Sequence, residues 1–310
     1  MKAVRARRGT VVVEEIEEPP GTGELVYVKS ASICGSDFGY LAGGSQSILG
    51  HELAGVTSDG RAVAVEALRA CMNCGPCFEG RYNLCSTAHQ QVLGMTVDGG
   101  LSEAFRHPAH HLEPLPAGLD VADASLVEPA SVAWHGLRIC GTDPASRVVV
   151  VGGGAIGLMA VAAARAMGAG EVALDARYPH QRQAGERLGA GEPSGLYDVV
   201  IESAGTSSAL ARSVELVGPG GSIALLGLHL EAFSPDFLTI FTKEARIVPS
   251  MAYCSHDGTK DFAEAASMLA ANPEIADTLI THRFPLSDAE EAFRVAQDRQ
   301  SGAIKVVIEP

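Results

Sequence analysis

Four cysteines lie close together in the segment CMNCGPCFEGRYNLC, residues 71–85. Thiols packed this densely can form disulfides, bind a metal ion or act as reactive groups. Disulfides are expected mainly in oxidising compartments and in small domains that lack a core, whereas this chain has 310 residues and an odd number of cysteines, seven. We therefore predict a structural zinc site, because four thiolates fill the zinc tetrahedron and leave no position for a substrate. Its ligands are Cys71, Cys74, Cys77 and Cys85.

A second set of potential metal ligands is spread along the chain. Cys34 lies in ICGSD, His51 and Glu52 lie in GHE, and Glu128 lies in VEPASVAWHG. Cysteine, histidine and glutamate are suitable ligands for a catalytic zinc, which takes three protein ligands and keeps one position for substrate. Taken singly, each residue has an ordinary structural alternative: a core cysteine, a histidine in a surface turn, and a glutamate at a helix start.

A glycine-rich turn follows a run of valines at residues 148–151. Gly152, Gly154 and Gly157 form G-x-G-x-x-G between this expected strand and an expected helix, the context that a dinucleotide-binding turn requires. The first glycine allows the tight turn, the second lets backbone amides approach a pyrophosphate, and the third lets helix and strand pack closely. The alternative is a flavodoxin-like strand, turn and helix that binds no dinucleotide.

An acidic residue, Asp175, ends the next expected strand. A carboxylate at this position accepts hydrogen bonds from the adenosine ribose and favours NAD. Arg177 and Arg182 follow closely, and because an arginine can hold a 2′-phosphate, NADP stays open.

These residues must be positioned by two different kinds of structure. Up to about residue 110, short apolar runs broken by Gly, Pro and Asp predict a β-rich domain, with strands at 25–33, 62–68 and 101–108. From Arg147 onward, strands alternate with helices, which predicts an α/β domain with a doubly wound parallel sheet. Further strands are expected at 171–175, 198–203 and 221–227, and a closing strand at 304–308 returns to the first domain.

Composition excludes several classes of partner. The formal net charge is −14, which disfavours binding to nucleic acid or to an anionic membrane. Residues 148–164 carry no charge, close to the lower limit for a membrane span, but the glycines at 152–154 divide them into strand, turn and helix. No leader peptide is recognised, and we expect a cytoplasmic protein.

The order of these motifs resembles the zinc-dependent medium-chain dehydrogenases, and within them the polyol branch, such as sorbitol dehydrogenase, and threonine dehydrogenase. The resemblance covers nearly the whole chain, through CGSD, GHE, the cysteine cluster, GMTVDGGLSEAF, VEPASVAWHG, VVVVGGGAIGLMA and ITHRFPLSDAEEAF. It implies a GroES-like catalytic domain, residues 1–130 and 250–310, and a Rossmann cofactor domain, residues 131–249.

The resemblance also assigns roles to single residues. Cys34, His51 and Glu128 surround the catalytic zinc, with Glu52 as a direct or alternate ligand. Ser36 hydrogen-bonds the substrate alcohol, and Asp37 orients the zinc-binding histidine. The histidine that often completes the proton relay is replaced by Gly39. The expected cofactor contacts are Gly152, Gly154, Ala155, Ile156, Gly157, Asp175, Arg177, Arg182, Ala204, Gly205, Leu226 and Gly227.

The function implied by the resemblance is hydride transfer between a secondary alcohol or polyol and NAD, with NADP as the other candidate cofactor. We expect two zinc ions per chain, a small alcohol or ketone as the substrate, and a homo-dimer or homo-tetramer. Two alternatives stay open at this point: a zinc-stabilised dinucleotide-binding protein without catalysis, and an NADP-dependent carbonyl reductase of the same fold.

Overall fold

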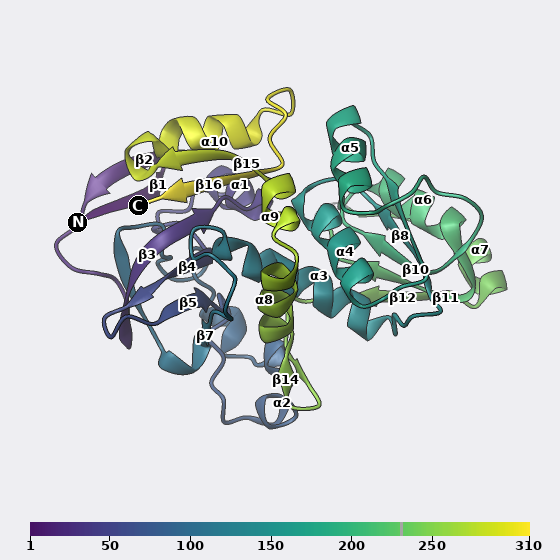
Figure 1. Cartoon of the computed structure of the whole chain (residues 1–310), viewed down its shortest axis with the longest axis horizontal. Coiled ribbons are helices and arrows are strands. Elements are labelled where there is room, and N and C mark those ends of the chain that lie inside the picture. Colours follow the sequence, from purple (N-terminus) through teal and green to yellow (C-terminus); the bar gives the residue numbers. More distant parts are fainter. Residues whose placement is uncertain (230–231) are drawn as a thin grey trace. The chain divides into compact units, whose positions relative to one another are not determined.

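The computed structural model describes residues 1–229 and 232–310. The chain forms two compact units, each of which is described by itself (Figure 1). Unit 1 contains Met1–Glu128 and Cys254–Pro310, and unit 2 contains Pro129–Tyr253. Unit 1 is therefore built from both ends of the chain, whereas unit 2 is one continuous segment.

Unit 1 is β-rich, as its short apolar runs predict. Its main sheet has the strand order β15-β16-β3-β4-β5-β7, with β6 paired to β3. A separate hairpin, β1-β2, turns through Arg8 and Gly9, which both have positive φ, 51° and 85°, as a two-residue turn of type I′ requires. The strands are β1 (Lys2–Arg7), β2 (Thr10–Glu15), β3 (Glu24–Ser32), β4 (Glu52–Thr57), β5 (Ala62–Val65), β6 (Ala104–His107), β7 (Leu112–Pro114), β13 (Ser255–His256), β14 (Thr259–Lys260), β15 (Ile280–Pro285) and β16 (Lys305–Glu309).

The end of the chain completes this sheet. Strand β16 pairs in parallel with β15 and antiparallel with β3, with Val307 opposite Ser32, which confirms that the closing strand returns to the first domain. In Figure 1 the yellow β16 lies beside the purple β3. The helices of unit 1 are α1 (Gly35–Ala42), α2 (Gly75–Phe78), α8 (Asp261–Ala271), α9 (Glu274–Leu279) and α10 (Ala289–Gln297), with 3₁₀ turns at Tyr82–Leu84, Ala88–Gln90, Ala109–His111, Ala124–Leu126 and Leu286–Asp288.

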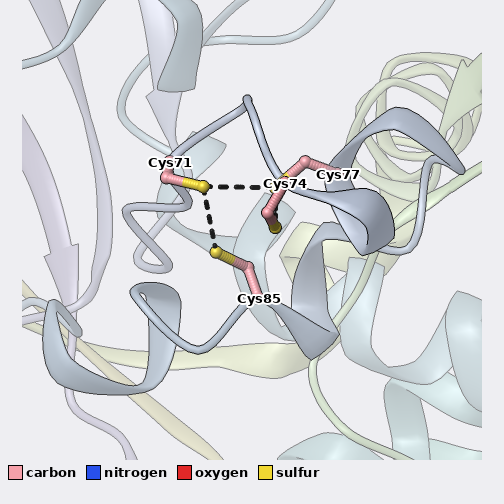
Figure 2. A group of neighbouring side chains, drawn as sticks. All are labelled: Cys71, Cys74, Cys77 and Cys85. Carbon is pink, nitrogen blue, oxygen red and sulfur yellow. Dashed lines mark hydrogen bonds between the residues drawn. The ribbon is translucent and has the colours of Figure 1, made fainter.

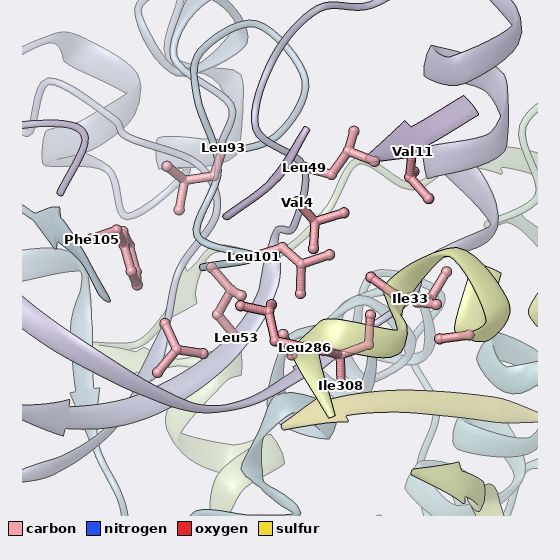
Figure 3. Packing of buried hydrophobic residues seen from close by; sticks show 14 of the residues in the cluster. Val4, Val11, Ile33, Leu49, Leu53, Leu93, Leu101, Phe105, Leu286 and Ile308 are labelled. Atoms are coloured by element: carbon pink, nitrogen blue, oxygen red, sulfur yellow. The ribbon is translucent and has the colours of Figure 1, made fainter. Parts of the chain in front are cut away.

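The core of unit 1 joins these segments (Figure 3). Val4, Leu53 and Leu101, from the first part of the chain, cluster with Leu286 and Ile308, from its end, and each is at most 4% exposed. Burial of apolar side chains is the dominant favourable contribution to folding. The first 128 residues therefore depend on the C-terminal segment for part of their core.

Unit 2 is a five-stranded parallel sheet with helices packed against it. The strand order is β12-β11-β10-β8-β9, and every neighbouring pair is parallel, which confirms the predicted doubly wound α/β fold. The valines of β8 are buried, as expected for a strand covered on both faces. Its elements are α3 (Val127–Ile139), which begins in unit 1, β8 (Arg147–Val151), α4 (Ala155–Ala166), β9 (Glu171–Asp175), α5 (Pro179–Arg187), β10 (Tyr197–Glu202), α6 (Ser207–Leu216), β11 (Val217–Leu225), α7 (Phe237–Lys243) and β12 (Arg246–Pro249).

Strand β9 forms one edge of this sheet. On its outer side, Ala173 forms a single parallel bridge to Gly191, and the chain then passes directly to β10. Within the described residues, no helix is long and apolar enough to cross a membrane, and the uncharged stretch after Arg147 is divided between β8 and α4.

Candidate metal centres and cofactor site

The four clustered cysteines converge from the segment before α2, from α2 itself and from the end of the following 3₁₀ turn (Figure 2). Their sulfur atoms all lie within 4.8 Å of one another. The recorded Sγ–Sγ distances are 3.4 Å for Cys74–Cys77, 3.5 Å for Cys85–Cys71 and 4.0 Å for Cys71–Cys77. Zn–S bonds of about 2.3 Å in a tetrahedron place sulfurs about 3.8 Å apart. The four thiols therefore fit a zinc ion.

The surroundings of the sulfurs differ. Burial and the hydrogen bond with Cys74 raise the pKa of the Cys77 thiol to about 12. At Cys85, burial opposes ionisation, but hydrogen bonds with backbone groups of Cys71 and Ala88 outweigh it and lower the pKa to about 6. The loop is anchored to the sheet by the buried Tyr82, whose hydroxyl donates to a carboxylate oxygen of Glu66 at 2.8 Å.

A second group of potential ligands forms inside unit 1. Ligand atoms of Cys34, His51 and Glu52 lie within 4.8 Å of one another. Antiparallel pairing of β3 with β4 places Ser32 opposite Glu52, so the chain leaves β3 at Cys34 beside the point where β4 begins. The structure thus brings together three residues that the sequence separates.

The carboxylate of Glu52 already has partners. Lys305, on β16, lies with its Nζ 2.9 Å from Oε1 and 2.7 Å from Oε2, and the Ser32 hydroxyl donates to Oε2. Burial opposes the charge of Glu52, but the ammonium group of Lys305 outweighs it, and the net pKa of Glu52 is lowered. Lys305 is a site residue that the sequence reasoning missed.

His51 is held between two polar side chains. Its Nδ1 lies 3.5 Å from Oδ1 of Asp37, and its Nε2 lies 3.4 Å from the hydroxyl of Ser36. The other oxygen of Asp37 accepts a hydrogen bond from the backbone amide of Cys34 at 2.9 Å. Asp37 Oδ1 and His51 Nδ1 are buried without a hydrogen bond, and they face each other as a carboxylate and a metal-binding histidine do. This arrangement leaves Nε2 as the ring nitrogen for a metal.

Glu128 lies in the first turn of α3 and is 9% exposed. Burial raises the pKa of its carboxyl to about 7; the charge of His51 lowers this pKa in part, and the charge of Glu52 raises it further. Glu128 therefore belongs to the same electrostatic environment, although the set within 4.8 Å consists of Cys34, His51 and Glu52.

The donor set fits a divalent cation. Burial and the nearby Glu52 carboxylate raise the pKa of the Cys34 thiol well above its usual range, and burial raises the pKa of Asp37. Three carboxyl groups and a thiol thus share one buried region with a single lysine. Burial disfavours the ionised forms of Cys34, Asp37 and Glu128, and a dication at this site would stabilise them. Sulfur, imidazole nitrogen and carboxylate oxygen are the donors that zinc prefers.

In unit 2 the glycine loop joins β8 to α4. A Cβ on Gly157 would lie 1.8 Å from the carbonyl oxygen of Gly152, and Gly152 itself has φ +114°. Both positions therefore require glycine. Gly154 precedes α4, where Ala155 and Ile156 begin the helix, and a Cβ there would meet no protein atom within 4 Å. The space around Gly154 is therefore open, and Gly154 caps the N-terminus of α4, where a helix can receive a phosphate.

Two further turns lie at the same edge of the sheet. The carboxyl ends of parallel strands lie at one edge of the sheet, so the turn after β8 lies beside the turn after β10. In the turn after β10, the backbone amide of Ser203 donates to the carbonyl oxygen of Val151 at 3.0 Å, and its hydroxyl donates to the carbonyl oxygen of Gly152 at 3.0 Å. Glu202 organises both further turns. Its Oε1 accepts the amides of Ala204 and Gly205, and its carbonyl accepts those of Leu226 and Gly227.

Two of the residues expected near the adenosine ribose, Asp175 and Arg182, have partners within the protein. Asp175 ends β9, and its Oδ2 accepts a hydrogen bond of 2.7 Å from Nε of Arg212, on α6. Arg182 donates to the carbonyls of Ala176 and Arg177, and the Arg177 side chain is exposed. Arg212 is a second residue that the sequence reasoning missed.

Two protein families match this chain. The alcohol dehydrogenase GroES-like domain matches residues 22–117, and the glucose dehydrogenase C-terminus matches residues 122–309. L-galactonate-5-dehydrogenase of Escherichia coli K12 is 31% identical, over 90% of this chain and 89% of its own length. Sorbitol dehydrogenase of Bacillus subtilis is 30% identical, over 92% of this chain and 90% of its own length.

A solved structure agrees with these relatives. The zinc-binding dehydrogenase of Sinorhizobium meliloti 1021 bound to NADP is 28% identical and superposes with a TM-score of 0.86, covering 100% of this chain and 99% of its own. The predicted GroES-like and Rossmann domain types are thereby confirmed. The chain belongs to the zinc-type medium-chain alcohol and polyol dehydrogenases, and it is an NAD(P)-dependent oxidoreductase that acts on alcohols.

Proposed function

We propose that this enzyme oxidises a secondary hydroxyl group of a polyol or sugar acid to the ketone, with NAD or NADP as the hydride acceptor. The observation that carries the proposal is the convergence of Cys34 and His51 in one buried region of unit 1 that also holds the carboxyl groups of Glu52 and Glu128. The glycine loop at the carboxyl edge of the sheet in unit 2 supplies the matching cofactor site. The sorbitol and galactonate relatives support the substrate class.

Cys34 and His51 hold the catalytic zinc, with Glu128 as the third ligand. Glu128 is favoured over Glu52 because Lys305 and Ser32 already bond both oxygens of Glu52. When bound there, zinc supplies a Lewis acid that lowers the pKa of a substrate hydroxyl.

The chain's own residues position the reacting groups and move the proton. Asp37 fixes the ring of His51 through Nδ1. Ser36, whose hydroxyl lies 3.4 Å from His51 Nε2, receives the proton of the substrate hydroxyl. Gly39 has no side chain to continue a relay, so the proton passes from Ser36 to water.

The four-cysteine site holds a second zinc ion with a structural role. The Sγ–Sγ distances of 3.4–4.0 Å support this assignment. Cytoplasmic location is part of the same proposal, supported by the seven cysteines, all of which are free thiols, since disulfides are rare in that compartment. A homo-dimer or homo-tetramer stays our expectation for the assembly.

The test combines metal analysis with a substrate panel. Purified protein should contain about two zinc ions per chain and should reduce NAD or NADP with at least one polyol or aldonate. Cys34→Ala and His51→Ala should lose one zinc and the turnover, whereas the matched control Cys140→Ala, a buried cysteine of unit 2, should keep both. Full zinc content and turnover in Cys34→Ala and His51→Ala would overturn the assignment. Turnover of ketones but not of alcohols would favour a carbonyl reductase.

A further inference from the structure

The acid that would receive the adenosine ribose is already paired with a cation. Arg212 Nε donates to Oδ2 of Asp175 at 2.7 Å, and its Nη1 donates to Glu215 at 2.8 Å. Among the described residues, no hydrogen bond to Oδ1 of Asp175 is recorded. A ribose diol can therefore find one carboxylate oxygen available and the other held by a guanidinium group.

The guanidinium group of Arg212 is placed to act on a nucleotide. The side chains of Arg212 and Asp175 are 43% and 35% exposed, so the pair lies at the surface of unit 2 and can rearrange. Hydrogen bonds to Asp175 and Glu215 raise the pKa of Arg212 above its usual value, which keeps the group a cation. A planar guanidinium binds phosphate oxygens through two parallel hydrogen bonds.

The two arginines nearest to Asp175 in sequence are less suited to this role. Arg182 Nη1 is bonded to backbone carbonyls at 2.9 Å and 3.1 Å, and the Arg177 side chain has no recorded contact with Asp175. Arg212 is the arginine that contacts the acid directly, although it is 37 positions away in sequence.

We propose that Arg212 is a specificity-determining residue that allows this site to accept both NAD and NADP. With NAD, Arg212 stays on Asp175, and the available carboxylate oxygen accepts the ribose 2′-hydroxyl. With NADP, Arg212 turns from Asp175 to the 2′-phosphate and offsets the repulsion between that phosphate and the carboxylate. The inference rests on the proposed function, because it requires a dinucleotide at the glycine loop.

The first experiment measures NADH and NADPH binding to the zinc-loaded protein by nicotinamide fluorescence, without substrate. Arg212→Ala should weaken NADPH binding by about tenfold to a hundredfold, the range of a charge-assisted hydrogen bond, and should change NADH binding by less than about threefold. The matched control is Arg187→Ala, which removes an exposed arginine from α5 and should leave both affinities unchanged. Equal loss for both nucleotides, or no loss for NADPH, would overturn the proposal.

The second experiment is a double-mutant cycle on NADPH affinity. Asp175→Ala should tighten NADPH binding about tenfold, because the repulsion disappears and Arg212 turns to the phosphate. Adding Asp175→Ala to Arg212→Ala should give a smaller gain, because only the relief of the repulsion remains and there is no Arg212 to release to the phosphate. An equal gain in both backgrounds would contradict a role for Arg212.

Two further measurements separate the possible failures. Thermal unfolding shows whether each variant folds. If Arg212→Ala does not fold, Arg212→Lys and Arg212→Gln replace it: Arg212→Lys should keep part of the NADPH affinity, and Arg212→Gln should lose it. Equal NADPH affinities of these two variants would overturn the proposal. If folded wild-type protein binds neither nucleotide, the proposed function itself fails. The inference is supported if the wild-type protein binds both nucleotides and the ratio of NADPH to NADH affinity changes in the Arg212 and Asp175 variants but not in Arg187→Ala.

Discussion

The ammonium group of Lys305 lies 2.7 Å and 2.9 Å from the two carboxylate oxygens of Glu52, and both side chains are almost fully buried. The same Nζ donates to the carbonyl oxygen of Ile33 at 3.2 Å, one residue before Cys34. Two buried charges are costly to remove from water, so such a pair is tolerated only with good geometry and further hydrogen bonds. Lys305 thus links the last strand to the candidate catalytic centre.

We predict that Lys305→Met destabilises unit 1 by about 3–5 kcal/mol, because it leaves the Glu52 charge buried and unpaired. The measurement is urea unfolding followed by circular dichroism. Lys29→Met, at an exposed position of β3, is the control and should change stability by less than about 0.5 kcal/mol. The double variant Lys305→Met, Glu52→Gln should recover most of the loss, and equal instability of the single and double variants would contradict an ion-pair effect.

Cys34 and His51 have ordinary structural alternatives when taken singly, and they are singled out because the order of all the motifs along the chain resembles that of a zinc dehydrogenase. Lys305 and Arg212 could not be predicted, since their roles come from partners 253 and 37 positions away. A signal for Lys305 was present: it is the one charged residue between Ile304 and Ile308, in an otherwise apolar strand. A charge at a position that should be buried requires a partner.

At the scale of single elements, the glycines of the loop between β8 and α4 have two different roles, one in packing and one in leaving space for a ligand. Gly157 is required for packing, since its Cβ would overlap the Gly152 carbonyl at 1.8 Å, whereas Gly154 has open space around it. The G-x-G-x-x-G pattern predicted both roles, because the first and third glycines serve the turn and the contact of helix with strand, and the second serves the approach of a pyrophosphate.

The two positions should respond differently to alanine. Gly157→Ala is expected to lower the thermal unfolding midpoint of unit 2 or to prevent folding, because α4 must move away from β8. Gly154→Ala should unfold near the wild-type temperature but bind NADH and NADPH at least about tenfold more weakly, since its methyl group occupies the space of the phosphate. Normal nucleotide binding by Gly154→Ala would contradict this placement of the pyrophosphate.

The loop that carries the four cysteines has few buried apolar side chains besides Tyr82, and two of its large residues, Phe78 and Leu84, are 78% and 47% exposed. We predict that Cys74→Ser removes one zinc ion and increases amide hydrogen exchange across residues 71–90, because metal binding stabilises a segment without a core. Cys140→Ser is the control and should alter neither reading in this loop. Full zinc content with unchanged exchange in Cys74→Ser would show that the cysteines are not ligands.

For the whole molecule, the order of the two units along the chain has consequences for folding. Unit 2 is one segment with its own five-stranded sheet, whereas unit 1 needs β15 and β16 from the end of the chain. Alternation of strands and helices predicted the sheet of unit 2. The strand order of unit 1 was beyond prediction, because β16 lies between β15 and β3 through pairings that no local pattern specifies.

We therefore expect residues 127–253, which keep α3 whole, to fold alone and unfold cooperatively. Residues 1–128 alone should not fold, because they lack two strands of the sheet and the core contacts of Leu286 and Ile308. Joining 1–128 to 254–310 through a flexible Gly/Ser linker should restore a folded unit with about two zinc ions, as the ligand sets imply. Circular dichroism, urea unfolding and zinc analysis distinguish these outcomes. Cooperative unfolding and full zinc content of residues 1–128 alone would show that the C-terminal strands are dispensable. We do not expect this outcome, because β16 pairs with β3 and Lys305 pairs with Glu52.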